Sequence, residues 1–162
     1  MDSTSSVISH ADILQAISIG VAIWVGLCVG SFLNVVAYRW PIMQKRKQDR
    51  LKQGTPGNIA IKAQPFNLSV PRSMCPSCGH QIRWYENIPV FSYLALRGKC
   101  SACQTPISAR YPLVEAVTAF MFGLLVWLLG TGVASVVGCA VTAVTIAWWL
   151  LEVDRCMQRL DL

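Results

Sequence analysis

Three long apolar segments constrain what this chain can fold into. Helical residues rise about 1.5 Å each, so about 20 of them cross a hydrocarbon core about 30 Å thick. Each segment is long enough, and a Gly-Thr-Gly sequence between the second and third indicates a tight hairpin. We therefore predict an α-helical integral membrane protein with about three transmembrane helices, at residues 13–38, 112–129 and 133–151.

Two other interpretations of these segments are weaker. The first segment is too long for the apolar part of a secretory signal peptide, and no Lys or Arg precedes it. The other two could be buried helices of a soluble domain. However, only 14% of the residues are charged, against about 25% in soluble domains, and little of the chain remains to cover such a core.

The basic residues predict the orientation of the chain. All fourteen Lys and Arg lie at positions 39–110 or 155–159, between and beyond the apolar segments. Basic loops stay in the cytoplasm, so residues 1–12 and the hairpin at Gly130 are expected outside, and the loop and the tail inside. A net charge of +6 often indicates nucleic acid, but this distribution favours membrane orientation and excludes a nucleic-acid partner.

The central loop divides into two parts. Residues 39–66 are basic and polar and predict a cytoplasmic linker that is solvated or touches anionic lipid headgroups. Residues 67–111 contain cysteines, prolines and aromatic residues, which are typical of a small compact domain. Residues 152–162 form the expected cytoplasmic tail.

Four cysteines in the second part predict a metal site. Cys75 and Cys78 form one C-x-x-C pair, Cys100 and Cys103 form another, and 21 residues separate the pairs. Two such turns can direct four thiolates at one Zn²⁺ ion, as in a zinc ribbon. Two disulfides would need an oxidising compartment, and a thioredoxin-like redox motif needs only one pair in a different context.

The predicted zinc has a structural role. Four thiolates close the tetrahedral shell and leave no position for a reacting water, so the metal would stabilise a domain too small to fold on its core alone. His80 could be a spare ligand, although a surface histidine is the simpler interpretation. Cys28 and Cys139 are expected to be small packing residues within helices, and Cys156 has no matching partner.

The first apolar segment carries polar and small residues near its cytoplasmic end. Gly26 and Gly30 form a G-x-x-x-G step that lets another helix approach closely. Ser31 and Asn34 are interpreted as donors for hydrogen bonds between helices. Arg39, with the neighbouring Trp40, is interpreted as an ordinary anchor at the membrane surface.

Three stretches of the chain resemble the type IV prepilin peptidases, a family of bacterial membrane aspartic proteases. The stretches together cover roughly residues 26–118, and their order and spacing match. They are GSFLNVVAYRWP at 30–41; PRSMCPSC at 71–78, followed by ENIP at 86–89 and LRGKC at 96–100; and PISARYPLVE at 106–115.

The resemblance implies a two-step enzyme in the bacterial inner membrane. Its substrates would be type IV prepilins or type II secretion pseudopilins, whose basic leader is cleaved and whose new N-terminal residue is then methylated with S-adenosylmethionine. The family cleaves with two aspartates, one at the cytoplasmic end of a span and one in a later G-x-G-D motif. Such a pair divides the roles of acid and base.

This chain contains no G-x-G-D sequence, and its tail matches the first aspartate motif imperfectly. Asp154 is the candidate for the first catalytic aspartate; the alternative is a helix-end charge paired with Arg155 or Arg159. We expect the polypeptide to be truncated, with a missing C-terminal half supplying the second aspartate. The alternative function is a membrane-anchored zinc module that binds prepilins or assembly components without cutting them.

The charge distribution yields a testable topology. Reporter fusions at residues 60 and 160 should report the cytoplasm, and a fusion at residue 131 should report the periplasm, because every basic residue then lies inside. A periplasmic signal from residue 60 would overturn the assignment and favour disulfides over a metal.

Overall fold

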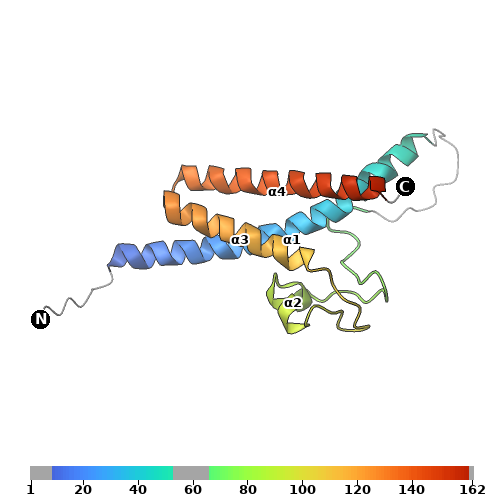
Figure 1. Ribbon diagram of the computed structural model, residues 1–162, viewed down its shortest axis with the longest axis horizontal. Helices are drawn as coiled ribbons and strands as arrows, with labels where there is room; N and C mark the ends of the chain where they lie inside the picture. The colour runs from blue at the N-terminus through green and yellow to red at the C-terminus, as the bar shows by residue number, and fades with distance from the viewer. Residues whose placement is uncertain (1–8, 53–65, 161–162) are drawn as a thin grey trace, which may run out of the picture.

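The computed structural model describes residues 9–52 and 66–160. The regular secondary structure of these residues is almost entirely helical (Figure 1). Predictions that fall on residues 1–8, 53–65 and 161–162, Asp161 included, lie outside the described residues. The described part contains two isolated β-bridges but no strand. Its helices are α1 (His10–Lys52), the 3-10 helix η1 (Trp84–Asn87), α2 (Phe91–Ala95), α3 (Arg110–Leu129) and α4 (Val133–Leu160).

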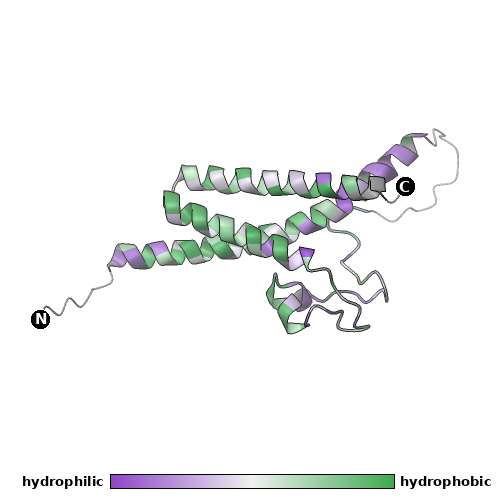
Figure 2. Cartoon of the chain, in the orientation of Figure 1, coloured by the Kyte–Doolittle hydropathy of each residue, from purple (hydrophilic) through white to green (hydrophobic). Residues whose placement is uncertain are grey.

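Three of these helices, α1, α3 and α4, are long and apolar enough to cross a membrane. Figure 2 shows hydrophobic residues along all three, with polar residues gathered at the far end of α1 and in the module below it. Many large apolar side chains on them are exposed, as a lipid-facing surface requires. The predicted fold class is confirmed: the chain is a helical membrane protein with a four-cysteine cluster between α1 and α3.

α1 and α4 each extend beyond the residues predicted for the corresponding transmembrane helix. α1 continues past Tyr38 and through Pro41 to Lys52, so the first part of the predicted linker is helical. The reason is local, because most of residues 43–52 are straight-chain side chains with high helix propensity. α4 likewise continues into the predicted tail, as far as Leu160. The predicted hairpin between α3 and α4 is present, and the Ser135 hydroxyl donates to the Gly130 carbonyl.

Close contact between α1 and α3 organises the bundle. A methyl group at Gly26 would lie 2.6 Å from the Cα of Ala119, and one at Gly30 would lie 2.7 Å from the Cα of Glu115. On the facing helix, a methyl group at Gly123 would lie 2.7 Å from the Ile23 side chain. The G-x-x-x-G step therefore does what the sequence predicts and brings two backbones together.

The buried core lies where α4 joins this pair. Its members are Leu33 and Ala37 of α1, Val114 of α3 and Leu150 of α4, with Val29, Ile146 and Ala147 packed around them. Polar contacts sit beside it: Asn34 donates to the Tyr111 carbonyl at 3.1 Å. The interpretation of Asn34 as a donor between helices is confirmed. Cys28, by contrast, is exposed, because it lies off the packed face of α1.

The glycine contacts predict a contrast between three otherwise similar substitutions. Gly26→Ala and Gly30→Ala should each destabilise the bundle by about 1–3 kcal/mol, because the added methyl group meets backbone that cannot move aside. Gly20→Ala is the matched control, since nothing lies within 4 Å of its added methyl group. Thermal unfolding in detergent, followed by circular dichroism, measures the difference. Equal melting temperatures for all three variants would contradict the packing argument.

Candidate metal centre

The two C-x-x-C pairs fold into two equivalent turns. In the first turn the Cys75 N–H donates to the His80 carbonyl at 2.8 Å, and the Gly79 N–H donates back to the Cys75 carbonyl at 2.9 Å. An antiparallel bridge between Met74 and Gln81 closes the turn. Gly79 has a φ of 72°, a left-handed conformation that glycine adopts without strain.

The second turn repeats this pattern 25 residues later. The Cys100 N–H donates to the Thr105 carbonyl at 2.9 Å, and the Gln104 N–H donates to the Cys100 carbonyl at 3.0 Å. Lys99 and Pro106 form the closing bridge. Gln104, with a φ of 61°, occupies the left-handed position that Gly79 has in the first turn. The recurrence identifies the turn as the structural unit that presents each cysteine pair.

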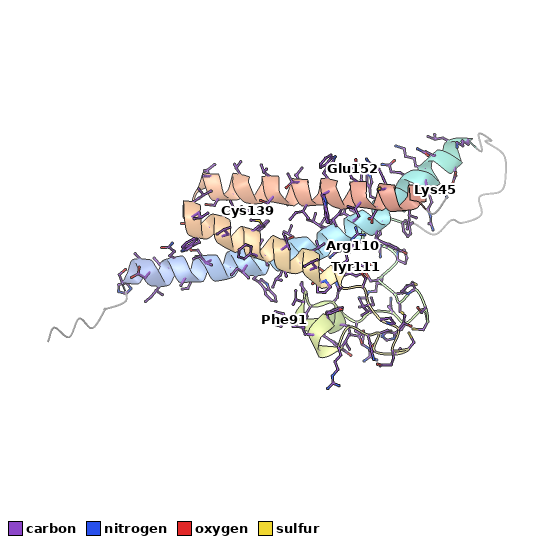
Figure 3. The ribbon with its side chains drawn as sticks, viewed as in Figure 1. Lys45, Phe91, Arg110, Tyr111, Cys139 and Glu152 are labelled. Atoms are coloured by element: carbon purple, nitrogen blue, oxygen red, sulfur yellow. The ribbon has the colours of Figure 1, made fainter. Side chains whose placement is uncertain are left out.

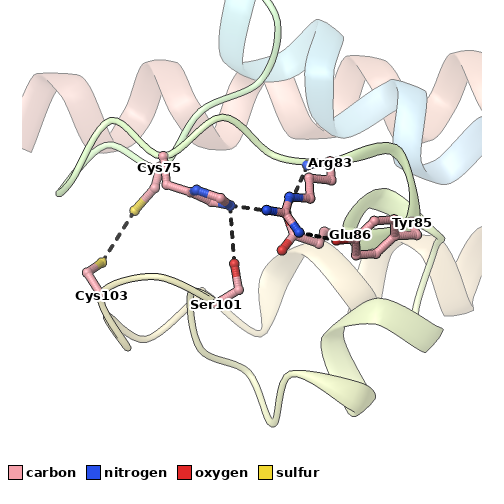
Figure 4. A network of polar contacts seen from close by, with 7 residues as sticks. Cys75, Arg83, Tyr85, Glu86, Ser101 and Cys103 are labelled. Carbon is pink, nitrogen blue, oxygen red and sulfur yellow. Dashed lines mark hydrogen bonds and ion pairs between the residues drawn. The ribbon is translucent and has the colours of Figure 1, made fainter.

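The two turns bring all four cysteine sulfurs together. The ligand atoms of Cys75, Cys78, Cys100 and Cys103 lie within 4.8 Å of one another, and the sulfurs of Cys75 and Cys103 are 3.8 Å apart (Figure 4). A tetrahedral zinc with bonds of about 2.3 Å places its sulfurs about 3.8 Å apart. All four cysteines are free, so the predicted cluster is present and has the spacing of a metal site.

Hydrogen bonds lower the pKa of Cys75 and Cys103, whereas the pKa of Cys78 is raised. Thr105 lowers the pKa of Cys103 to about 6 through its hydroxyl and backbone N–H. The backbone N–H groups of Cys78 and Ser77 lower the pKa of Cys75. At Cys78 the His80 N–H acts in the same direction, but the neighbouring sulfurs and burial outweigh it and raise the pKa to about 12. Four thiolates so close together require a bound cation.

His80 lies outside the sulfur cluster and links the two turns. Its Nε2 atom is 3.3 Å from the Glu86 carboxylate and 3.2 Å from the Ser101 hydroxyl. The Arg83 N–H also donates to Glu86, at 2.8 Å, and together these partners lower the pKa of Glu86 to about 2. The ionised carboxylate therefore stabilises the fold above its ordinary pKa, and this contribution is lost as the pH falls toward 2.

Arg39 fixes the module to α1. The interpretation of Arg39 as an ordinary surface anchor is wrong, because the residue is only 7% exposed. Its guanidinium donates to the Asn67 carbonyl at 2.8 Å and to the Pro71 carbonyl at 2.7 Å. It also lies 5.7 Å from the centre of the Phe66 ring. The planar guanidinium thus holds Asn67 and Pro71, at the start of the module, against α1.

Glu115 makes the corresponding attachment on α3. The residue is 8% exposed, and its carboxylate accepts the Val90 N–H at 2.6 Å and a hydrogen bond from Ser31. Val90 has a φ of 58°, an unfavourable conformation for a β-branched residue. The contact with Glu115 helps to hold this backbone conformation, in which the Phe91 N–H donates to the Pro89 carbonyl at 2.6 Å.

Asp154 is paired with Arg110 rather than with Arg155, one of the two partners expected from the sequence; the side chain of the other, Arg159, lies outside the described residues. Arg110 at the start of α3 donates to both carboxylate oxygens, at 2.5 and 3.1 Å. Arg155 pairs instead with Glu152 on its own helix, at 2.5 Å. Figure 3 shows Arg110 and Glu152 from different helices near this end of the bundle. Asp154 therefore joins the end of α4 to the start of α3.

Comparison with known proteins identifies the family. The model of the bacterial peptidase A24 N-terminal domain matches residues 24–129, which include α3 and the whole four-cysteine module. The chain belongs to this family. Relatives from several bacteria carry the name prepilin leader peptidase/N-methyltransferase. No solved structure matches.

Three of these relatives show the extent of the similarity. The protein of Pseudomonas putida is 46% identical over 130 residues, which cover 80% of this chain and 45% of the relative. That of Neisseria gonorrhoeae is 40% identical, with 90% of this chain and 52% of the relative covered. That of Dichelobacter nodosus is 55% identical over 98 residues, 57% of this chain and 34% of the relative. The matched part of the chain covers from 34% to 52% of the length of these three relatives.

Sequence reasoning found the cysteines and missed the residues that attach their module. No role in holding one segment against another was predicted for Arg39, Glu115 or Arg110. All three lie in the stretches that resemble the prepilin peptidases: Arg39 is in the later part of α1, and Arg110 and Glu115 are in the first two turns of α3. A charged residue at the end of an apolar segment was the available signal. A charged residue in that position is equally consistent with a buried contact to another segment and with an anchor at the membrane surface.

The Arg39 contacts predict what the residue contributes. Arg39→Ala should leave two backbone carbonyls without their donor and destabilise the attachment of the module by about 3 kcal/mol. The expected result is faster proteolysis between residues 67 and 108, measured by limited trypsin digestion with mass spectrometry. Lys47→Ala, an exposed charge on the same helix, is the control. Identical cleavage in both variants would contradict the attachment.

Proposed function

We propose that this chain is the zinc-bearing membrane half of a prepilin leader peptidase that also methylates the N-terminus it creates. The observation that carries the proposal is the match of 80–90% of the chain to proteins of that name. The substrates are type IV prepilins or type II secretion pseudopilins with basic leaders. S-adenosylmethionine is the methyl donor, by resemblance to the family alone.

The proposed orientation places on the cytoplasmic side the module, the part of α1 from Arg39 onward, and the end of α4 that bears Asp154. Twelve of the fourteen basic residues lie at positions 39–110, from the later part of α1 to the first residue of α3, and basic segments stay on the cytoplasmic side of the bacterial inner membrane. The four-cysteine module then faces the compartment in which thiols remain reduced. A reduced compartment favours a bound metal over disulfides.

The proposed metal is zinc, and its role is structural. Cys75, Cys78, Cys100 and Cys103 would hold it, and a four-sulfur shell leaves no position for water or substrate. The bound ion would supply the positive charge that lets all four sulfurs ionise together. The module has no large core: among its described residues only Cys75 and Cys100 are buried apolar side chains. Metal binding would therefore supply much of its folding free energy.

The zinc proposal predicts about one zinc per chain in protein purified without added metal. Cys75→Ser and Cys100→Ser should lose the ion and expose the remaining thiols to alkylation. Cys28→Ser and Cys156→Ser, which remove exposed cysteines outside the cluster, are the controls and should retain it. Acidification should release the zinc, because protons compete for the thiolates. Metal analysis by mass spectrometry with thiol counting measures all three effects. A zinc-free protein with four alkylatable thiols would refute the site.

For cleavage, we propose Asp154 as the first of the two carboxylates that act on water. It lies near the end of α4 that would face the cytoplasm, where a membrane aspartic peptidase meets the leader. A second carboxylate must hold the opposite protonation state beside the same water. Glu152 pairs with Arg155 and does not face Asp154, because residues two apart on a helix point in different directions. Asp161 lies outside the described residues, and seven residues of an ideal helix would separate it from Asp154 by about 10 Å. The second acid is therefore expected from outside residues 1–162.

The alternative function is a module that binds prepilins or assembly components without cutting them. The ion pair between Asp154 and Arg110 favours it for the isolated polypeptide, because the candidate carboxylate already has a structural partner. The two functions make different predictions for substitutions on either side of this pair.

The catalytic proposal predicts that a polypeptide of residues 1–162 does not release the leader from a prepilin. Adding a segment with a G-x-G-D sequence in trans should restore cleavage, and Asp154→Asn should then abolish it. Glu152→Gln, on the same stretch of α4, should leave it intact. Leader release on a gel is the measurement. Cleavage by the unaided polypeptide would show that the argument from two carboxylates is wrong.

A second comparison separates catalysis from structure at Asp154. If the carboxylate only pairs with Arg110, then Arg110→Gln and Asp154→Asn should lose equal stability and equal activity. The swapped pair Arg110→Asp with Asp154→Arg should then recover both. A catalytic Asp154 predicts that the swap recovers the melting temperature without cleavage. Recovery of cleavage would remove Asp154 from the proposed site.

A further inference from the structure

The short helix α2 exposes large apolar side chains although it belongs to the polar module. Phe91 is 58% exposed and Leu94 is 65% exposed. Residues three apart share one face of a helix, so the two side chains form a single apolar face. Ser92 and Tyr93 are partly buried, which places the packed face of α2 on its other side. In the described part of the chain, nothing shields the Phe91–Leu94 face from its surroundings.

The attachment at Glu115 fixes the depth of this face relative to the spans. Val90, which directly precedes α2, donates its N–H to the Glu115 carboxylate at 2.6 Å. Glu115 is five residues after Arg110, which is about 7.5 Å along the axis of α3. The 20 residues of α3 have a length of about 30 Å, the thickness of the hydrocarbon core. The start of α2 therefore lies beside the part of α3 that enters the bilayer.

The residues around this point have the character of a membrane boundary. Leu113 on the adjoining turn of α3 is 63% exposed and must face lipid if α3 spans. Figure 3 shows Phe91 at the edge of the module that faces back along the spans, near the first turn of α3. Arg97 and Lys99 follow α2 and are both exposed, as residues that contact anionic headgroups are.

We propose that α2 is an interfacial anchor, with Phe91 and Leu94 inserted among the lipids and Arg97 and Lys99 at the headgroups. The occupant of this apolar face is the phospholipid of the membrane that α1 and α3 cross. Lipid fits the face because its depth is set by a contact with a spanning helix, and because its apolar surface continues that of α3. The module is then held at the membrane by Arg39, by Glu115 and by α2 itself.

Site-directed photo-crosslinking in the intact chain tests the anchor. Benzoylphenylalanine is placed at Phe91 or Leu94, and the full chain is illuminated in vesicles of phosphatidylethanolamine and phosphatidylglycerol. Ser77 and Ala102, exposed residues between the cysteines of each turn, are the control positions. Mass spectrometry then detects phospholipid adducts. We expect adducts at positions 91 and 94 and none at 77 and 102.

The other outcomes overturn the proposal. No lipid adduct at positions 91 and 94 would place α2 in water. A crosslink from these positions to a second copy of the chain would make the face a protein interface. Equal lipid adducts at all four positions would mean that the whole module lies on the membrane and that α2 has no special role. None of these outcomes depends on cleavage or methylation, so the anchor and the proposed function can fail separately.

Discussion

The close approach of α1 and α3 is the contact on which the rest of this structure depends. The two helices precede and follow the four-cysteine module, so their packing decides where its two ends lie. Gly26 and Gly30 remove the side chains that would separate the backbones, and Ala119 and Glu115 receive them. In lipid there is little hydrophobic gain from helix association, and such fitted contact supplies the attraction instead. α4 then packs on the same pair through Leu150.

Charged residues near the membrane boundary hold neighbouring segments against this helix pair. Arg39, Glu115 and Arg110 are costly to place near hydrocarbon, and each finds a partner on another segment. No buried side-chain nitrogen or oxygen lacks a hydrogen-bond partner in the described parts of the chain. Loss of the partner of a desolvated charge costs more than loss of an apolar contact, so each of these contacts fixes a specific geometry between the two segments that it joins. An apolar contact would allow the module to slide.

The four-cysteine module depends on both local and distant contacts. Each turn is local, since backbone hydrogen bonds within eight residues aim two sulfurs in one direction. The meeting of the two turns is distant, and the hydrogen bonds of His80 with Glu86 and Ser101 help to fix it. If zinc binds, the ion completes a site that the backbone has largely arranged. This division explains why the cysteines can be found from their spacing, whereas their supporting residues cannot.

The sequence by itself determined the three apolar helices, the hairpin at Gly130, the close approach at Gly26 and Gly30, and the four-cysteine group. These follow from composition, chain length and short spacings, which act over one or two turns. The tertiary structure decided the partners of the charges. Arg39 contacts backbone 28 and 32 residues away, and Asp154 pairs with Arg110 rather than with the nearby Arg155. A charge near hydrocarbon takes whichever partner the packed helices bring within reach, and sequence separation does not record that distance.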